Sequence, residues 1–120
     1  MKYGNDDALQ ALAALANGTR LEVFRLLVRQ GPVGMPAGEI AEALAVAPST
    51  LSPHLTQLER ARLITSRRNE RRIFYALNID GTRGLLSFLT DECCQGHPEL
   101  CLGLREAASL GQPALATEER

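Results

Sequence analysis

The hydrophobic period of the sequence changes from helical to alternating and back again, and this pattern limits the folds available to the chain. Up to residue 62 the apolar residues recur every three or four positions, which is typical of amphipathic helices. They then alternate in two short runs, residues 63–67 and 72–77, around a polar tip with the sequence RNER. Such alternation predicts two half-buried strands joined by a turn. After the second strand the helical period returns.

Four helices are predicted before the hairpin and one after it. They cover residues 6–17, 19–31, 38–47, 48–63 and 80–94. The first helix has acids at its start, where the helix dipole favours them, and leucines at three-residue spacing. These leucines are Leu9, Leu12 and Leu15. Because Gly31 and Pro32 end the second helix, residues 32–38 are predicted to form a loop.

Residues 48–63 differ in composition between their two faces. Leu51, Leu55 and Leu58 form an inward row, whereas the outward face carries small polar side chains and a histidine. The outward residues are Ser49, Thr50, Ser52, His54 and Gln57. Such side chains also occur on solvated helices, but they can enter the major groove of DNA and bond base edges or phosphates. Pro53 removes a backbone donor, and we expect it to bend the first turns.

The hairpin that follows is strongly basic. Six arginines and two glutamates give residues 48–72 a formal charge of +4, so the rest of this −1 chain carries −5. The arginines at the hairpin tip are Arg67, Arg68, Arg71 and Arg72. A local basic block is the electrostatic footprint of a nucleic-acid contact. Two short helices, a tight turn at Val46 and Ala47, and a basic hairpin predict a winged helix-turn-helix, mainly α with a β-hairpin wing, that binds double-stranded DNA.

The stretch STLSPHLTQLERARLI and its surroundings resemble the ArsR/SmtB family of metal-responsive repressors over residues 9–101. The resemblance implies a homodimer built on the first and last helices. It also implies that two copies of the fourth helix read operator DNA, and that an inducer releases the protein. The family's DNA-contact positions fall on Ser49, Thr50, Ser52 and His54, and its wing falls on residues 67–72.

The last predicted helix is apolar on more than one face, which favours a partner surface as well as a core. Its apolar residues include Leu85, Leu86, Phe88 and Leu89. We therefore expect residues 1–101 to form one DNA-binding and dimerisation domain that includes the inducer site. Residues 102–120 are expected to be a partly disordered tail.

All three cysteines lie in the segment DECCQGHPELC, at Cys93, Cys94 and Cys101. An odd number of thiols cannot all be paired in disulfides. Gly96 and Pro98 interrupt the helix, so the chain could fold back and bring Cys101 over the other two. Thiolates select soft, thiophilic metals. The segment also resembles the C-terminal three-cysteine cluster of some arsenic-responsive ArsR/SmtB repressors. We therefore expect a three-sulfur site for trivalent arsenic or antimony, with arsenite or antimonite as inducer and no required cofactor.

Two other uses of these thiols remain open. Zinc prefers four ligands in a tetrahedron, and His97 would complete such a set with the three sulfurs. A redox switch needs only two thiols, one of them with a depressed pKa. Two sites known in the resembling family cannot be carried over, because residues 37–46 contain no cysteine and the last helix offers only Asp91 with His97 beyond it.

Several classes of protein are disfavoured by what the sequence lacks. No apolar run approaches the roughly 18 residues of a membrane helix, and the first ten residues lack a signal-peptide core. We therefore expect a cytoplasmic protein with reduced thiols. There is no glycine-rich phosphate loop or Ser-His-Asp order, and no arginine follows Cys93 at the spacing of a thiol-dependent phosphatase. We expect no enzymatic activity.

Overall fold

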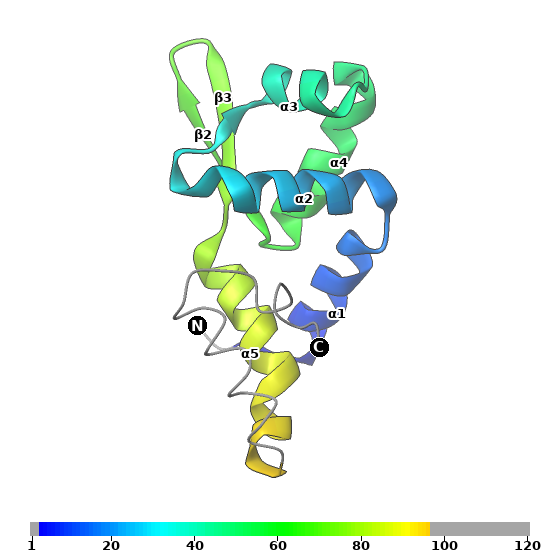
Figure 1. Cartoon of the computed structure of the whole chain (residues 1–120), viewed down its shortest axis with the longest axis vertical. Helices are drawn as coiled ribbons and strands as arrows, with labels where there is room; N and C mark the ends of the chain where they lie inside the picture. Colours follow the sequence, from blue (N-terminus) through cyan, green and yellow to red (C-terminus); the bar gives the residue numbers. More distant parts are fainter. Residues whose placement is uncertain (1–2, 97–120) are drawn as a thin grey trace, which may run out of the picture. The chain divides into compact units, whose positions relative to one another are not determined.

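The computed structural model describes residues 3–96, and the surroundings of their side chains as far as residue 90. Its elements are α1 (Asn5–Leu15), α2 (Gly18–Gln30), the 3-10 helix η1 (Gly31–Val33), β1 (Met35–Pro36), α3 (Ala37–Leu44), α4 (Pro48–Arg60), β2 (Ile64–Asn69), β3 (Arg72–Leu77) and α5 (Ile79–Gly96) (Figure 1). The described residues divide into two compact units after Leu85. The first unit has the mainly helical, winged helix-turn-helix architecture that the sequence predicts.

The core of this unit is built on α4. Leu51, Leu55 and Leu58 are buried on one face of the helix, as predicted, and α4 packs on α1, α2, α3 and β2. The other helices and the hairpin contribute further buried apolar side chains: Val23, Leu27, Ile40, Ala41, Leu63 and Ile64. Burial of one such leucine stabilises the fold by about 1.5–3 kcal/mol. The helix-turn-helix therefore rests on a continuous apolar core.

The packing of α1 differs from the simplest interpretation of its leucine spacing. Its buried residues are Ala8, Ala11 and Ala14, whereas 58% of Leu9 and 41% of Leu12 are exposed. Alanine side chains are short, so this face of α1 can approach α2 and α4 closely. The larger leucines lie outside that close contact, and they leave an apolar surface on α1.

The sheet has three antiparallel strands, with β3 between β1 and β2. The third strand, β1, lies within the segment for which the sequence predicts a loop, and it is only two residues long. Its pairing of Met35 with Tyr75 ties this segment to the hairpin. Such a short strand has no recognisable alternation of its own, so periodicity could not reveal it.

A close contact joins the start of α5 to the corner between α4 and β2. Gly81 is buried, and a Cβ atom added there would overlap the backbone carbonyl group of Arg62. Arg62 itself has a left-handed φ of 64°, which is uncommon for a residue with a side chain. Asn78 Oδ1 accepts a hydrogen bond from the Gly81 N–H at 3.0 Å and caps this end of the helix. Gly81 is therefore required by the space available.

We predict that Gly81→Ala lowers the free energy of unfolding by about 2 kcal/mol. Helix propensity alone would favour alanine by about 1 kcal/mol, but the contact is with backbone and cannot be relieved by a side-chain rotation. Urea denaturation followed by circular dichroism, at one protein concentration, measures the difference.

The matched control is Gly38→Ala in α3, where nothing lies within 4 Å of the added Cβ. Here propensity acts alone, and the stability should rise by about 0.5–1 kcal/mol. Equal gains in the two variants would contradict the close contact at Gly81.

Candidate nucleic-acid interface

The N-terminus of α4 is open to a ligand from outside the chain. Pro48 occupies the first helical position, and the capping residue Ala47 has no side-chain oxygen. The N–H of Ser49 finds no acceptor among the described residues. Unsatisfied N–H groups and the helix dipole together favour an anion at such an end. This end of α4 therefore suits a phosphate group.

The outward face of α4 is polar and contains no acid. Ser49, Thr50, Ser52 and Gln57 are exposed, as predicted, and His54 is half-buried. No aspartate or glutamate occurs between residues 43 and 58. This face can therefore approach a polyanion without like-charge repulsion from its own side chains.

Pro53 lies inside α4 without interrupting it, since the helix runs from Pro48 to Arg60. The proline lacks the N–H that would have bonded to the carbonyl of Ser49. Thr56 Oγ1 donates to the Ser52 carbonyl at 3.2 Å in the next turn. The three buried leucines of α4 hold the helix to the core across the missing bond.

His54 contacts an arginine that no pattern in the sequence singles out. Arg20 of α2 places a guanidinium nitrogen 3.2 Å from His54 Nδ1, and its Nε–H donates to the carbonyl oxygen of Ala14 at 2.7 Å. The two side chains are 34 residues apart in sequence. Periodic patterns in the sequence relate only residues a few positions apart, so the contact could not be predicted from them. The fold brings the two side chains together.

The register of the hairpin separates the four wing arginines. β2 and β3 are joined by a two-residue turn, and Arg67 lies opposite Phe74 on the neighbouring strand. The guanidinium carbons of Arg67 and Arg72 lie 5.0 and 5.6 Å from the centre of the Phe74 ring. Arg72 also forms an ion pair with Glu39 of α3 at 3.1 Å. The contacts with Phe74 lie within the hairpin and stabilise it. Arg72, through Glu39, and Arg67, whose Nη2 donates to the carbonyl oxygen of Val33 at 3.3 Å, also tie the wing to the body of the domain.

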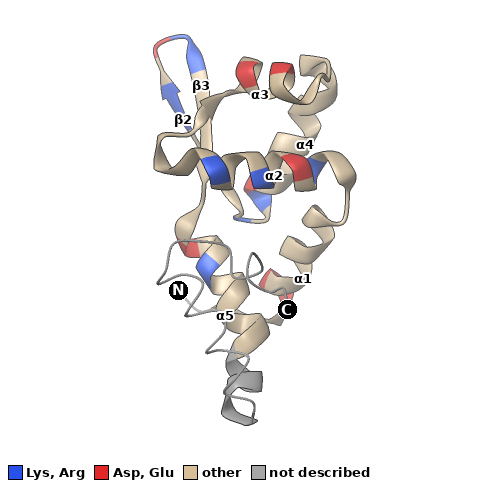
Figure 2. Cartoon of the chain, in the orientation of Figure 1, with Lys and Arg blue, Asp and Glu red and all other residues tan. Residues whose placement is uncertain are grey.

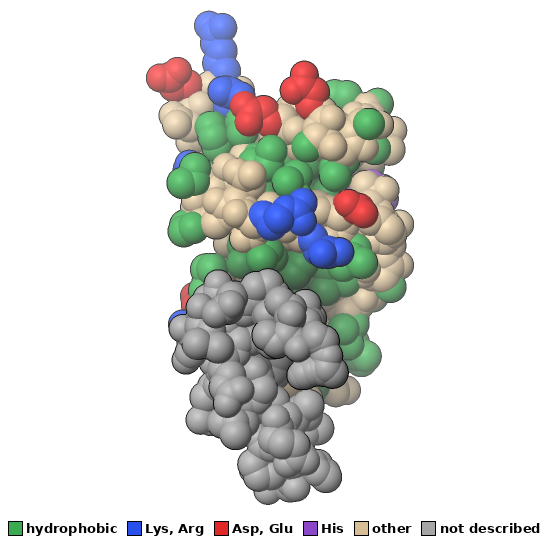
Figure 3. Space-filling model, in the orientation of Figure 1, with side chains coloured by type: hydrophobic (Ala, Val, Ile, Leu, Met, Phe, Trp, Pro, Cys, Tyr) green, Lys and Arg blue, Asp and Glu red, His purple; other side chains and the backbone are tan. Residues whose placement is uncertain are grey.

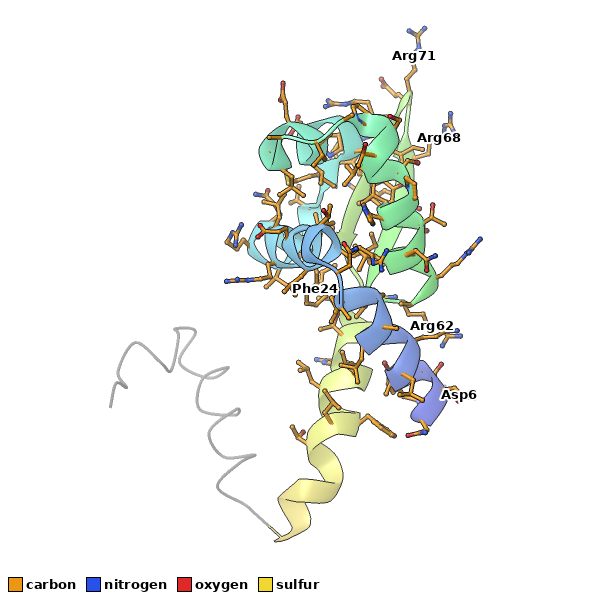
Figure 4. The ribbon with its side chains drawn as sticks, turned by 90° about the vertical axis from the view of Figure 1, so that its right-hand side faces the viewer. Asp6, Phe24, Arg62, Arg68 and Arg71 are labelled. Carbon is orange, nitrogen blue, oxygen red and sulfur yellow. The ribbon has the colours of Figure 1, made fainter. Side chains whose placement is uncertain are left out.

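Arg68 and Arg71 have a different environment. Both side chains extend outward from the hairpin, Arg71 from its tip (Figure 4). Neither has an acid or hydrogen-bond acceptor within reach in the part of the chain that the structure describes. The neighbouring α3 carries acidic side chains, in contrast to the basic hairpin (Figure 2). Arg68 and Arg71 are thus the wing cations available to an external anion.

The wing is also tied to the C-terminal end of α4. Ser66 Oγ donates to Glu59 Oε2 at 2.7 Å. Burial, with Glu59 as a second cause, raises the pKa of Tyr75 above its ordinary value, so that its phenol stays protonated. The one acid near the end of the α4 face is therefore engaged in a hydrogen bond with the wing.

The predicted inducer residues are only partly covered by the structure. Cys93 and Cys94 belong to the last turns of α5, but their side chains are not described, and His97 and Cys101 lie outside the described residues. Among the side chains that are described, no group of three His, Cys, Asp or Glu residues could hold a metal ion. The three-sulfur site remains a prediction from the sequence.

The face of the molecule seen in Figure 3 is of mixed character. Over its described part, apolar side chains are interspersed with arginines and acids. No helix within residues 3–96 is long and apolar enough to cross a membrane.

Comparison with known proteins identifies the type of domain. A family described as a helix-turn-helix domain matches residues 15–67. The transcriptional activator HlyU of Vibrio cholerae is 28% identical over 97 residues, which cover 81% of this chain and 87% of HlyU. Its solved structure superimposes with a TM-score of 0.61, over 78% of this chain and 99% of the other.

Two further solved structures are similar. Mb0332 from Mycobacterium bovis is described as a homodimeric winged helix-turn-helix DNA-binding domain and a possible ArsR-family transcriptional regulator. It is 32% identical, with a TM-score of 0.59, over 77% of this chain and 85% of that chain. A possible transcriptional regulator for arsenical resistance is 28% identical, with a TM-score of 0.60, over 71% and 84% of the two chains. The chain therefore belongs to the ArsR family of winged helix-turn-helix transcriptional regulators.

Proposed function

We propose that the protein is a homodimeric repressor that binds operator DNA through α4 and the wing. The observation that carries this proposal is the pairing of an acid-free polar helix face with two wing arginines, Arg68 and Arg71, that have no partner within the described part of the chain. In a two-fold dimer the two α4 helices enter successive major grooves, about one helical turn apart. Ser49, Thr50, Ser52, His54 and Gln57 would face base edges or phosphates. Such a regulator acts in the cytoplasm, where the DNA is.

Replacing Arg68 and Arg71 together by alanine should weaken binding to every DNA sequence by a similar factor. The plot of log affinity against log salt should also become less steep, by about 0.9 in slope for each phosphate that is no longer neutralised. Fluorescence anisotropy with an operator duplex and a random duplex, over a series of salt concentrations, measures both quantities.

The control is the pair Arg25→Ala and Arg29→Ala on α2, which removes the same charge from exposed residues outside α4 and the wing. This control should leave the salt slope unchanged. A loss of affinity for the preferred operator alone, in the Arg68 and Arg71 variant, would mean that the wing reads bases.

The dimer is proposed to form through the exposed face of α1 together with α5. Leu9 and Leu12 leave apolar area on α1, and Leu86 and Leu89 of α5 are 51% and 44% exposed. A monomer would expose these leucines to water at a cost of about 25 cal/mol for each Å². The homodimeric state described for the relative Mb0332 supports a dimer.

We predict that the double substitution Leu9→Glu and Leu12→Glu converts the dimer into a monomer. Two carboxylates per chain would meet their counterparts across the interface, and burial of such charges is strongly unfavourable. Sedimentation velocity at micromolar concentration distinguishes the two states. Val33→Glu, at a site that is 68% exposed and lies in η1, is the matched control and should remain dimeric. A parent protein that sediments as a monomer, alone and with DNA, would refute the dimer.

As inducer we propose trivalent arsenic or antimony bound to the thiolates of Cys93, Cys94 and Cys101. The support is chemical: three soft ligands lie within nine positions, and the chain has no other cysteine. Similarity to a possible regulator for arsenical resistance points the same way. A zinc site that also uses His97 is the alternative among metals.

A thiol redox switch is the second candidate for the same cysteines. One of the similar solved structures is described as reduced HlyU from Vibrio cholerae, so the oxidation state of that relative is specified. A redox switch would need only two of the three thiols.

The three single variants Cys93→Ser, Cys94→Ser and Cys101→Ser separate these possibilities. Each should bind the operator as the parent does and resist release by arsenite, because two thiolates and a hydroxyl hold a trivalent metalloid poorly. Operator release by arsenite, by zinc and by a mild thiol oxidant is measured for each. His97→Ala is the control, and it should keep the arsenite response. Full arsenite response in Cys101→Ser would exclude the three-sulfur site, and release by oxidant alone would favour the redox switch.

A further inference from the structure

Arg20 connects three helices at one point. It lies in the first turn of α2, where its backbone N–H donates to Asn17 Oδ1 at 3.1 Å. Its Nε–H donates to the carbonyl oxygen of Ala14, in the last turn of α1, at 2.7 Å. Its Nη1 lies 3.2 Å from Nδ1 of His54, in the middle of α4. The side chain thus bridges α1 and the DNA-facing helix.

The contact with α1 holds the guanidinium in place. The carbonyl groups in the last turn of a helix have no donors within the helix, and a cation is favourable there. The guanidinium is also planar, so fixing its Nε fixes the direction of its other nitrogens. With one side of the group anchored on Ala14, the nitrogen that faces His54 is already oriented.

The contact with His54 selects one form of the imidazole ring. A guanidinium can only donate hydrogen bonds, so Nδ1 must be the acceptor. A ring that accepts at Nδ1 is neutral and carries its proton on Nε2. The Nε2–H group finds no acceptor among the described residues. It is therefore a free donor on the helix that faces DNA.

We propose that Arg20 is a positioning residue that fixes His54 as a neutral Nε2–H donor to DNA. The inference rests on the proposed DNA-binding function and goes beyond it by assigning a role to a residue of α2. A single N–H donor can bond a phosphate oxygen or a base acceptor such as guanine O6 or N7. A ring free to exchange its tautomers would offer that donor for only part of the time.

The tautomer can be read without DNA. Long-range ¹H–¹⁵N correlation spectra distinguish a protonated from an unprotonated ring nitrogen, and the chain has only two histidines, His54 and His97. In a His97→Gln background at mildly alkaline pH, we expect the Nε2–H pattern for His54. Arg20→Lys should give a mixture of the two neutral tautomers, because a flexible ammonium group lacks the fixed geometry of guanidinium. A parent ring that is protonated on Nδ1, or a mixture in the parent, would overturn the proposal.

A double-mutant cycle tests the consequence for DNA binding. The probe is a duplex selected from a randomised pool on the parent protein. His54→Leu should weaken binding about ten-fold, as expected when one hydrogen bond to a base or phosphate is removed. Arg20→Lys should weaken it several-fold in the parent and cause no further loss in the His54→Leu background. His54→Gln, whose amide can both accept from Arg20 and donate to DNA, should retain most of the affinity.

The control is Arg29→Lys in the last turn of α2, which should leave affinity and tautomer unchanged. Circular dichroism is used to show that each variant is folded at the temperature of the assay. Additive effects of the Arg20 and His54 substitutions would show that Arg20 acts only through general stability, and would overturn the positioning role. A parent protein that binds no duplex from the pool would instead overturn the proposed function, and with it any role of His54 on DNA.

Discussion

The burial of three leucines on α4 determines how the rest of the domain is arranged. Leu51, Leu55 and Leu58 are spaced four and three residues apart, so they form one stripe on the helix. Replacing any one of them by alanine would lower the free energy of unfolding by about 2–5 kcal/mol. Differences in helix propensity between ordinary residues are smaller, at about 0.7 kcal/mol or less. This stripe explains why α4 can tolerate both an internal proline and an N-terminus without a side-chain cap. Because it fixes which face is buried, it also fixes which side chains are presented to a partner.

The wing depends on a second regularity, the alternation of side chains along a strand. A two-residue turn at Glu70 and Arg71 sets the register, and Glu70 adopts a left-handed φ of 62° to make it. Arg67, Arg72 and Phe74 are then on one face, and Arg68 is on the other. The four arginines look equivalent in the sequence only while residues 68–71 are treated as one polar tip. With a two-residue turn in place of a four-residue tip, strand alternation puts Arg67 and Arg72 on one face and Arg68 on the other. This part of the site could therefore have been derived from the sequence.

Other features could not be derived in that way. The helix-turn-helix and wing follow from the change of period near residue 63, and the inward row of α4 follows from its leucine spacing. On α1, by contrast, alanines and leucines recur at the same spacing, and hydrophobicity alone favours burial of the leucines. The close approach of α1 to α2 and α4 selects the alanines instead. The contact between Arg20 and His54 depends on tertiary structure, as does the fit of Gly81 against Arg62.

The same contacts suggest how a change at the proposed dimer surface could reach the proposed DNA-binding surface. Energetic coupling between two sites requires a physical connection that differs between two states. Because Arg20 is bonded to the Ala14 carbonyl of α1, a movement of α1 would disturb that bond, and through it the ring of His54. At the other end of α4, Gly81 packs against Arg62, which lies just before β2, so the start of α5 adjoins the base of the wing. An inducer that displaces α1 would act on α4, and one that displaces the start of α5 would act on the base of the wing. A coupling of about 1–3 kcal/mol, or about 5–150-fold in affinity, lies within the range of one or two such contacts.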